Sequence, residues 1–264
     1  MRLTIKLSVW LGVRNRAIAV NSYLMAEARR MTRVDGRSND ELRPVEIVRG
    51  FLKNPEGSVL IKTGDTQVIC SATVEEDVPP WLNGTGRGWV TAEYGMLPRA
   101  TAERTDRYKV TGREQEIQRL IGRSLRAAVN LNRLGERSVK IDCDVIQADG
   151  GTRTASITGG FVALCDALSF MVDMGMIHEL PLLGSVAAVS VGVLNDEVLL
   201  DLSYPEDSRA AVDMNVVMRD DSYVEVQGTG ENAVFDRKTL DLMLSLAEKG
   251  IKDLIAKQRE SLSP

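Results

Sequence analysis

The stretch Asp149-Gly-Gly-Thr-Arg-Thr-Ala-Ser156 joins a strand pattern on one side to a helix pattern on the other. Residues 139–146 alternate apolar and polar side chains, which predicts a half-buried strand with Asp142 and Asp144 on its polar face. From about residue 155 to 174, apolar residues recur at helical spacing and outnumber the polar ones, which predicts a central, mostly buried helix. The two glycines between these elements allow a sharp turn.

Before this unit, the pattern indicates short strands, a loop and one helix. The β-rich runs 58–62 and 67–73 flank a turn-like composition and predict a hairpin, and residues 88–94 predict a third strand. Residues 98–112 follow neither period, which predicts a long and functional loop. Over residues 114–131, apolar side chains at helical spacing and a separate arginine stripe predict a helix.

After this unit, the pattern indicates two hairpins and a closing helix. Runs 186–194 and 197–202 meet at Asn195-Asp196, and runs 211–218 and 223–227 meet at a similar polar turn. Residues 236–259 predict the last helix. The order of strands and helices predicts an α+β fold, with mixed sheets packed against helices.

Composition and length indicate a soluble globular protein with one domain over residues 31–264. The chain has 264 residues, of which 44% are hydrophobic and 27% charged, which excludes collagen, coiled coil and wholesale disorder. Residues 1–30 differ, with six basic residues and one acid, and their apolar run at 7–13 is too short to span a membrane. We expect these residues to be a disordered or untranslated extension, with Met31 as the true start; an organelle transit peptide is the alternative.

The few cysteines and the single histidine restrict the chemistry. Cys70, Cys143 and Cys165 are widely spaced among apolar neighbours, which favours free thiols in a reducing compartment, the cytoplasm, over a disulfide framework or a metal site. His178 lies in a loop-like stretch, so we expect it to be structural or exposed. No serine elbow, cysteine–histidine pair or HExxH motif occurs, so the sequence offers no evident protein nucleophile.

Basic residues gather in one segment of a chain whose formal net charge is −4. Between residues 99 and 126 there are four acidic residues and eight basic ones, namely Arg99, Arg104, Arg107, Lys109, Arg113, Arg119, Arg123 and Arg126. This concentration favours a confined anion site over a general affinity for nucleic acid, and a solvated helix face is the alternative.

The Gly-Gly turn is the best candidate for an anion pocket. A helix that begins beside it presents unpaired N–H groups and a partial positive charge, while Thr152 and Arg153 add a hydroxyl and a guanidinium fork. The alternative is a simple glycine turn with Thr154 as N-cap. A second glycine motif, Gly228-Thr-Gly230-Glu-Asn-Ala233, satisfies GxGxxA but lacks the βαβ surroundings of a dinucleotide site.

Two aspartates are the candidate metal ligands. Asp207 follows one β-rich run and Asp213 opens the next, so the two carboxylates can share one hard cation such as Mg²⁺, with water and substrate oxygens completing its shell. A turn-forming Asp207 and a solvent-facing Asp213 are the alternative reading of this spacing.

Over residues 33 to about 260 the chain resembles the ribonuclease PH family of phosphorolytic 3′-to-5′ exoribonucleases. The resemblance rests on a long, ordered series of motifs: Asp35-Gly-Arg37, Glu41-Leu-Arg-Pro44, Gly88-Trp-Val-Thr-Ala-Glu-Tyr94, Met96-Leu-Pro-Arg-Ala-Thr101, Glu116-Ile-Gln-Arg-Leu-Ile-Gly-Arg123, the stretch from Ile141 to Ser156, Val212-Asp-Met-Asn215, Gln227-Gly-Thr-Gly-Glu231 and Ala247-Glu-Lys-Gly250. Agreement of this length is far more specific than any single motif.

The resemblance implies roles for the candidate residues. In the family, phosphate is held by an arginine ahead of the first long helix, here Arg113 after Gly112, and by the Gly-Thr-Arg turn, here Gly151, Thr152 and Arg153. The paired metal-associated aspartates correspond to Asp207 and Asp213, and the loop arginines for RNA and subunit contact correspond to Arg99, Arg104 and Arg107. That loop departs from the pattern, because its part from Arg107 to Gly112 is shorter than in some relatives.

The resemblance also implies an activity and partners. We expect a tRNA nucleotidyltransferase that trims the 3′ ends of tRNA precursors and other RNAs with inorganic phosphate as co-substrate and Mg²⁺ as cofactor. The expected subunit forms a ring, a homo-hexamer built as a trimer of dimers, and associates with no membrane. A catalytically silent ring subunit like those of the exosome is the main alternative, and a small-molecule phosphorylase is a further one.

Overall fold

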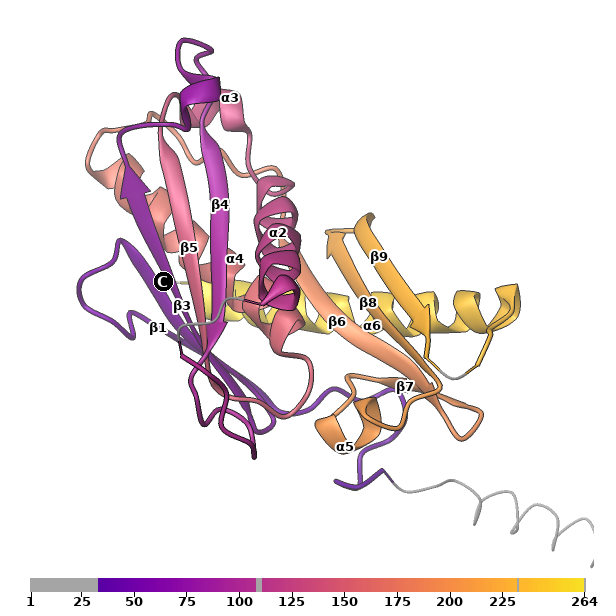
Figure 1. Cartoon of the computed structure of the whole chain (residues 1–264). Helices are drawn as coiled ribbons and strands as arrows, with labels where there is room; N and C mark the ends of the chain where they lie inside the picture. The colour runs from indigo at the N-terminus through magenta and orange to yellow at the C-terminus, as the bar shows by residue number, and fades with distance from the viewer. Residues whose placement is uncertain (1–32, 108–110, 232, 264) are drawn as a thin grey trace, which may run out of the picture. The chain divides into compact units, whose positions relative to one another are not determined.

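The computed structural model describes residues 33–107, 111–231 and 233–263. Residues 39–264 form one compact unit, and residues up to Ser38 belong to another. In its described part, the larger unit holds two β-sheets and three long helices (Figure 1), which confirms the predicted α+β class. The predicted extension at residues 1–30 and Lys109 of the basic segment lie outside the described residues, and a single domain from residue 31 stays a prediction.

The first sheet brings two chain segments to one edge. Its strands, in spatial order, are β1 (Val45–Arg49), β2 (Gly57–Thr63), β3 (Thr66–Glu75), β5 (Ser138–Gln147) and β4 (Trp89–Met96). The predicted β2–β3 hairpin is confirmed, and β4 pairs with β5 in parallel. Because parallel strands end at the same edge, the loop after β4 and the Gly-Gly turn after β5 leave the sheet together.

The second sheet is antiparallel throughout, in the order β7 (Glu197–Leu200), β6 (Val186–Leu194), β8 (Val212–Arg219) and β9 (Ser222–Gly230). Asn195 and Asp196 have φ values of 52° and 65°, as a two-residue hairpin turn requires. Strand β7 ends two residues before the predicted limit, because Asp201, with φ 53°, leaves the extended conformation.

Helix α4 (Thr152–Asp173) is the core helix of the fold. It contacts β2 and β3 of the first sheet and β6 of the second, and its side chains Ile157, Phe161 and Leu168 are at most 2% exposed. By length and composition the helix could cross a membrane, but 78% of its apolar window is buried inside the protein. That burial is typical of the central helix of a globular core.

Helix α2 (Gly112–Arg126) packs on β4 and α4 and differs from the prediction at both ends. It begins early because Thr111 and Glu114 form a reciprocal capping box. It ends early because the Asn130 side chain accepts the N–H groups of Asn132 and Arg133 and starts the short helix α3 (Leu131–Leu134).

Helix α6 (Arg237–Leu262) packs against the second sheet. The Asp236 carboxylate caps it by accepting the N–H of Thr239 at 2.8 Å. Met243, Ala247 and Ile251 are fully buried against this sheet, so the predicted closing helix is confirmed and runs three residues further. Two short helices, η1 (Pro80–Leu82) and α5 (Tyr204–Asp207), complete the described elements.

Candidate phosphate and metal site

The turn before α4 requires glycine at both positions. Gly150 and Gly151 have φ values of 77° and 64°, which L side chains rarely adopt. A Cβ on Gly150 would lie 2.6 Å from the carbonyl oxygen of Leu202. Helix α4 begins at Thr152, three residues before the predicted start, and Thr154 is not its N-cap, since its hydroxyl donates to the carbonyl of Gly151 at 2.9 Å.

The first turn of α4 has no side-chain cap. The N-cap residue is Gly151, which has no side chain that could accept the N–H groups of this turn. Those N–H groups and the helix dipole therefore remain available to an anion. This geometry supports the predicted anion pocket over the alternative of a simple capped turn.

Arg43 fixes the carbonyl side of the same turn. Its side chain donates to the carbonyls of Asp149 at 2.5 Å and Gly150 at 3.4 Å, and it forms a bidentate pair with Asp201 at 2.6 and 3.0 Å. Arg43 is 4% exposed; burial alone would lower its pKa, but the hydrogen bond and charge of Asp201 raise the pKa above its ordinary value. The sequence marked Arg43 only as part of the motif Glu41-Leu-Arg-Pro44, and its role was missed.

Thr66 adds a second support from β3. Its hydroxyl donates to the carbonyl of Gly150 at 2.7 Å and accepts the N–H of Asp149 at 2.9 Å. Thr66 and Arg43 together satisfy the backbone groups of Asp149 and Gly150, which holds the turn in one conformation.

Tyr94, at the end of β4, orients the hydroxyl of Thr152. The two oxygens are 2.8 Å apart, and either hydroxyl can be the donor. Burial raises the pKa of Tyr94 to about 12, so the phenol keeps its proton and remains able to donate. Sequence reasoning missed this role, although Tyr94 closes one of the motifs that carry the resemblance.

The charges of two arginines act on the carboxylates of the site. Arg153, in the first turn of α4, donates to Gln227 of β9 at 3.4 Å, and Arg113 has no side-chain hydrogen bond or ion pair within the described part of the chain. The positive charges of both arginines act to lower the pKa of Asp207 and of Asp213. These four predicted residues therefore share one electrostatic neighbourhood.

The carboxylate pair is partly buried rather than solvent-facing. Burial, followed by the charge of Asp207, raises the pKa of Asp213 to about 6, and burial also raises the pKa of Asp207. Glu231 adds a third negative charge that raises both pKa values, a neighbour that the sequence analysis did not single out. Such mutual repulsion favours a bound cation.

The donor set fits Mg²⁺. The Oδ1 atom of Asp213 is buried and has no hydrogen-bond partner among the described residues, so one hard oxygen donor is left unsatisfied. The described ranges contain no group of three or more His, Cys, Asp and Glu side chains that could hold a metal. A cation bound by Asp207 and Asp213 would therefore take most of its ligands from water and substrate, which is usual for Mg²⁺.

The three loop arginines lie on the surface of the segment that follows β4. Arg99, Arg104 and Arg107 are exposed in the segment after β4. The start of this segment is hydrogen-bonded to the residue before Asp149 and the Gly-Gly turn, because the carbonyl of Ala100 accepts the N–H of Ala148 at 2.8 Å. This bond keeps the start of the loop close to the Gly-Gly turn.

The second glycine motif and the remaining candidates do not form a site. Gly228 and Gly230 lie in strand β9, and the next helix starts only at Arg237, so the strand–turn–helix geometry of a dinucleotide site is not formed there. The three cysteines are buried free thiols and His178 is exposed, as predicted.

Known proteins match this chain along most of its length. Models of the 3′ exoribonuclease family match residues 41–168 with domain 1 and residues 184–250 with domain 2. Ribonuclease PH of Corynebacterium diphtheriae is 57% identical over 235 residues, 88% of this chain and 98% of that protein. Ribonuclease PH of Moorella thermoacetica is 59% identical over 237 residues, with coverages of 88% and 95%.

Solved structures share the fold. An Archaeoglobus fulgidus exosome with RNA bound to the active site has a chain that superposes with a TM-score of 0.76 and 26% identity, over 89% of this chain and 96% of that one. An archaeal exosome core gives a TM-score of 0.72 at 26% identity, with coverages of 90% and 95%.

Proposed function

Because the chain belongs to the 3′ exoribonuclease family, with relatives named ribonuclease PH at 57–59% identity, we propose that it shortens RNA from the 3′ end by phosphorolysis. The observation that carries the proposal is the uncapped first turn of α4, which contains Arg153, an arginine whose charge, like that of Arg113, acts on the carboxylates of Asp207 and Asp213. Trimming of tRNA precursors is the processing role that this activity serves.

The chemistry requires positioning more than a protein nucleophile. An oxygen of orthophosphate attacks the phosphorus of the last phosphodiester, and the bond from that phosphorus to O3′ of the preceding nucleotide breaks. The O3′ atom takes up a proton, so the products are a nucleoside 5′-diphosphate and RNA shorter by one nucleotide. The protein has to hold two anions in line, which arginines and helix N–H groups do well.

Each candidate residue has a role in that scheme. Thr152, Arg153 and the N–H groups beside Gly151 hold the attacking phosphate, and Arg113 contacts it from α2. Asp207 and Asp213 would hold Mg²⁺, which supplies positive charge to the phosphate that is being transferred. Asp213 can also hold a proton near the leaving oxygen, since its pKa of about 6 is close to neutrality.

We predict that the affinity for Mg²⁺ falls steeply below about pH 6. A carboxyl whose folded pKa is raised to about 6 is protonated below that pH, and protons then compete with the cation for Asp213. Calorimetric titration of Mg²⁺ at several pH values measures this, with Asp213→Asn as the variant that should bind weakly at every pH. An affinity that is constant between pH 5 and 8 would contradict the assignment.

The ionised Asp213 should also reduce stability when no metal is bound. Its folded pKa lies above its unfolded value of 3.8, so the folded state binds the proton more tightly. The contribution of Asp213 to the stability of the metal-free protein should therefore fall as the pH rises from about 4 to about 6. Thermal unfolding of Asp213→Asn should lack this component, and an identical pH dependence in both proteins would count against it.

A labelled RNA incubated with and without orthophosphate tests the proposed activity. Phosphate-dependent release of nucleoside diphosphates supports the enzyme. RNA binding without shortening supports a silent ring subunit, and no response to RNA supports a small-molecule phosphorylase. The presence of Arg113, Arg153 and both aspartates favours the first outcome.

We propose further that six copies form a ring, a trimer of dimers, in the cytoplasm. Most soluble homo-oligomers close through such symmetric interfaces, and three buried thiols suit a reducing compartment. Light scattering after size-exclusion chromatography should give the mass of six chains of 29.0 kDa. A monomer mass at micromolar concentration would reject the ring.

A further inference from the structure

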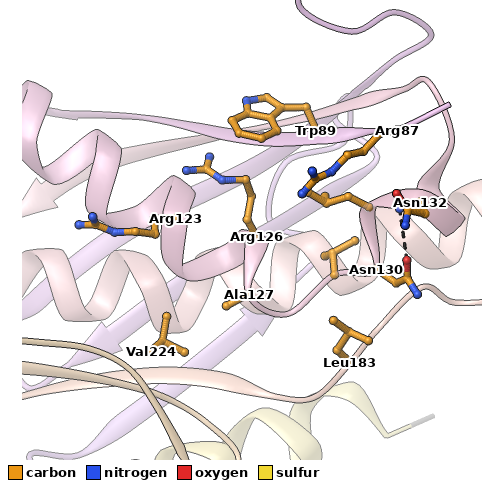
Figure 2. A pocket seen from close by; sticks show the side chains of 11 residues that line it. Arg87, Trp89, Arg123, Arg126, Ala127, Asn130, Asn132, Leu183 and Val224 are labelled. Carbon is orange, nitrogen blue, oxygen red and sulfur yellow. Dashed lines mark hydrogen bonds between the residues drawn. The ribbon is translucent and has the colours of Figure 1, made fainter. Parts of the chain in front are cut away.

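A basic cavity lies at the C-terminal end of α2, while Arg113 lies near the N-terminal end. Figure 2 shows side chains of this cavity, whose volume is about 720 Å³, within the range of ligand sites. We call it the α2 pocket, and its lining includes Arg87, Trp89, Arg123, Arg126, Leu183 and Val224. None of the residues assigned to the phosphate site belongs to it.

The arginines of the α2 pocket outnumber their acidic partners among the described residues. Arg123 pairs with Glu225 at 2.7 Å, whereas Arg87 has no hydrogen bond or ion pair of its side chain in the part of the chain that the structure describes. Arg126 donates to the carbonyl of Val90 at 2.7 Å and has no acidic partner within those ranges. Burial, and then the charge of Arg123, lower the pKa of Arg126, as expected where like charges gather. A bound anion would relieve this repulsion.

The walls of the pocket suit a nucleotide rather than a bare ion. The guanidinium of Arg126 stacks over the ring of Trp89 at 4.2 Å, so the pocket holds an arginine plane and an aromatic ring, the two kinds of group on which unpaired bases stack. In Figure 2 Val224 and Leu183 lie on the side away from Trp89, so the cavity combines charge with apolar surface. Asn130 and Asn132 add amides that can bond to base edges.

Hydrogen bonds and one ion pair connect the pocket with the phosphate site along α2 and β9. Gln227 accepts a hydrogen bond from Arg153 and donates one to Glu116 of α2 at 2.6 Å. Further along the same two elements, Arg123 pairs with Glu225, and the next residue of β9, Val224, lines the pocket. Helix α2 and strand β9 thus both extend from the neighbourhood of Arg153 to the pocket.

The distance from Glu116, where Gln227 joins α2, to the pocket arginines can be expressed in nucleotides. Arg123 and Arg126 follow Glu116 by seven and ten residues, which at 1.5 Å per residue is about 10 and 15 Å along α2. At roughly 3.4 Å per stacked nucleotide, that separation corresponds to about three to four nucleotides.

We propose that the α2 pocket binds a nucleotide of the RNA substrate about three to four positions upstream of the 3′ terminus. The inference rests on the proposed function, since it takes the RNA end to lie next to the phosphate that Arg153 holds. It assigns to Arg87, Arg123 and Arg126 a role in holding the body of the RNA, separate from the arginines that hold phosphate.

The test measures RNA binding without phosphate, so that it does not depend on turnover. Fluorescence anisotropy compares a dinucleotide with an RNA of about ten nucleotides, which spans both places. In Arg87→Ala we expect weaker binding of the longer RNA, a salt slope reduced by about 0.7 for the lost phosphate contact, and unchanged binding of the dinucleotide. Arg237→Ala, an exposed arginine outside the pocket, is the matched control and should match the wild type.

Cross-linking places the contact along the RNA. A 4-thiouridine about three or four positions from the 3′ end should react with the segment 123–132, and the same base at the 3′ terminus should not. Reaction of the terminal base alone would overturn the proposal.

Three other results also separate the possibilities. An unchanged salt slope in Arg87→Ala, with diphosphate release intact, overturns the pocket and leaves the proposed function standing. Pocket-dependent RNA binding without any diphosphate release overturns the proposed function and keeps the pocket. A changed oligomer size in Arg87→Ala, with an unchanged salt slope, assigns the pocket to contact between copies of the chain and overturns the RNA proposal.

Discussion

Replacing Arg153 with alanine is expected to reduce phosphate-dependent release of nucleoside diphosphates by about 10²–10³-fold or more. The substitution removes the guanidinium fork beside the uncapped first turn of α4, where the attacking phosphate is held. It also removes a positive charge that lowers the pKa of Asp207 and Asp213, so the carboxylate pair would bind metal less well near neutral pH. Initial rates over a range of phosphate concentrations measure the loss.

Controls for this experiment come from the same chain. Arg153→Lys keeps the charge but loses the planar fork, so its rate should lie between those of the wild type and the alanine variant. RNA affinity without phosphate and the circular dichroism spectrum should be unchanged in both variants, because Arg153 is a partly exposed residue with one long hydrogen bond. An undiminished rate in Arg153→Ala would remove this residue from the reaction.

The substitution Arg43→Ala is expected to lower the free energy of unfolding by about 3–5 kcal/mol. Asp201 would then remain as a buried carboxylate without the guanidinium that now pairs with both of its oxygens. The carbonyls of Asp149 and Gly150 would also lose a donor. Urea denaturation followed by circular dichroism measures the change.

An exposed ion pair serves as the control for the buried pair of Arg43 and Asp201. Arg237 pairs with Asp241 at 2.7 Å across one helical turn and is 84% exposed, so Arg237→Ala should cost less than about 1 kcal/mol. If Arg43→Ala does not fold, Arg43→Lys still tests the idea, since it keeps the charge and loses the bidentate contact. Its KM for phosphate should rise more than its kcat falls, and an unaltered KM together with unaltered stability would show that Arg43 does not support the turn.

Local pattern was sufficient to predict most elements of the fold. Alternation and turn residues identified both hairpins of the second sheet, and Asn195-Asp196 adopts the positive φ values that its composition favours. The errors lie at helix ends. Apolar residues at helical spacing predict a helix that continues through Asn130, whereas the Asn130 side chain caps the next helix. Periodicity alone does not reveal such a cap.

The site was predictable only in part. The sequence proposes Arg153, Thr152 and the two aspartates as candidates because they stand beside glycines or at ends of strand patterns. Arg43 could not be found by the same reasoning, since it lies 106 residues before the turn that it supports and meets it only through the packed sheet. Contacts of that kind depend on the tertiary structure and leave no periodic signal in the sequence.

The α2 pocket, too, could not be predicted from the sequence alone. Arg123 and Arg126 stood out in the sequence as an arginine stripe, and a solvated helix face was the simplest alternative for them. Their position becomes informative only when Arg87 from before β4 and Val224 from β9 are brought beside them.

Transfer of labelled orthophosphate tests the central claim most directly. RNA is incubated with the protein and ³²P-labelled orthophosphate, and the position of the label in the released nucleotides is determined. If phosphate bound at Gly151, Thr152 and Arg153 attacks the RNA end, each released nucleotide should be a nucleoside diphosphate with the label in its β-phosphate, and Arg153→Ala should release almost none. Release of unlabelled nucleoside monophosphates at the same rate with and without phosphate would show that water is the attacking group and would contradict the account.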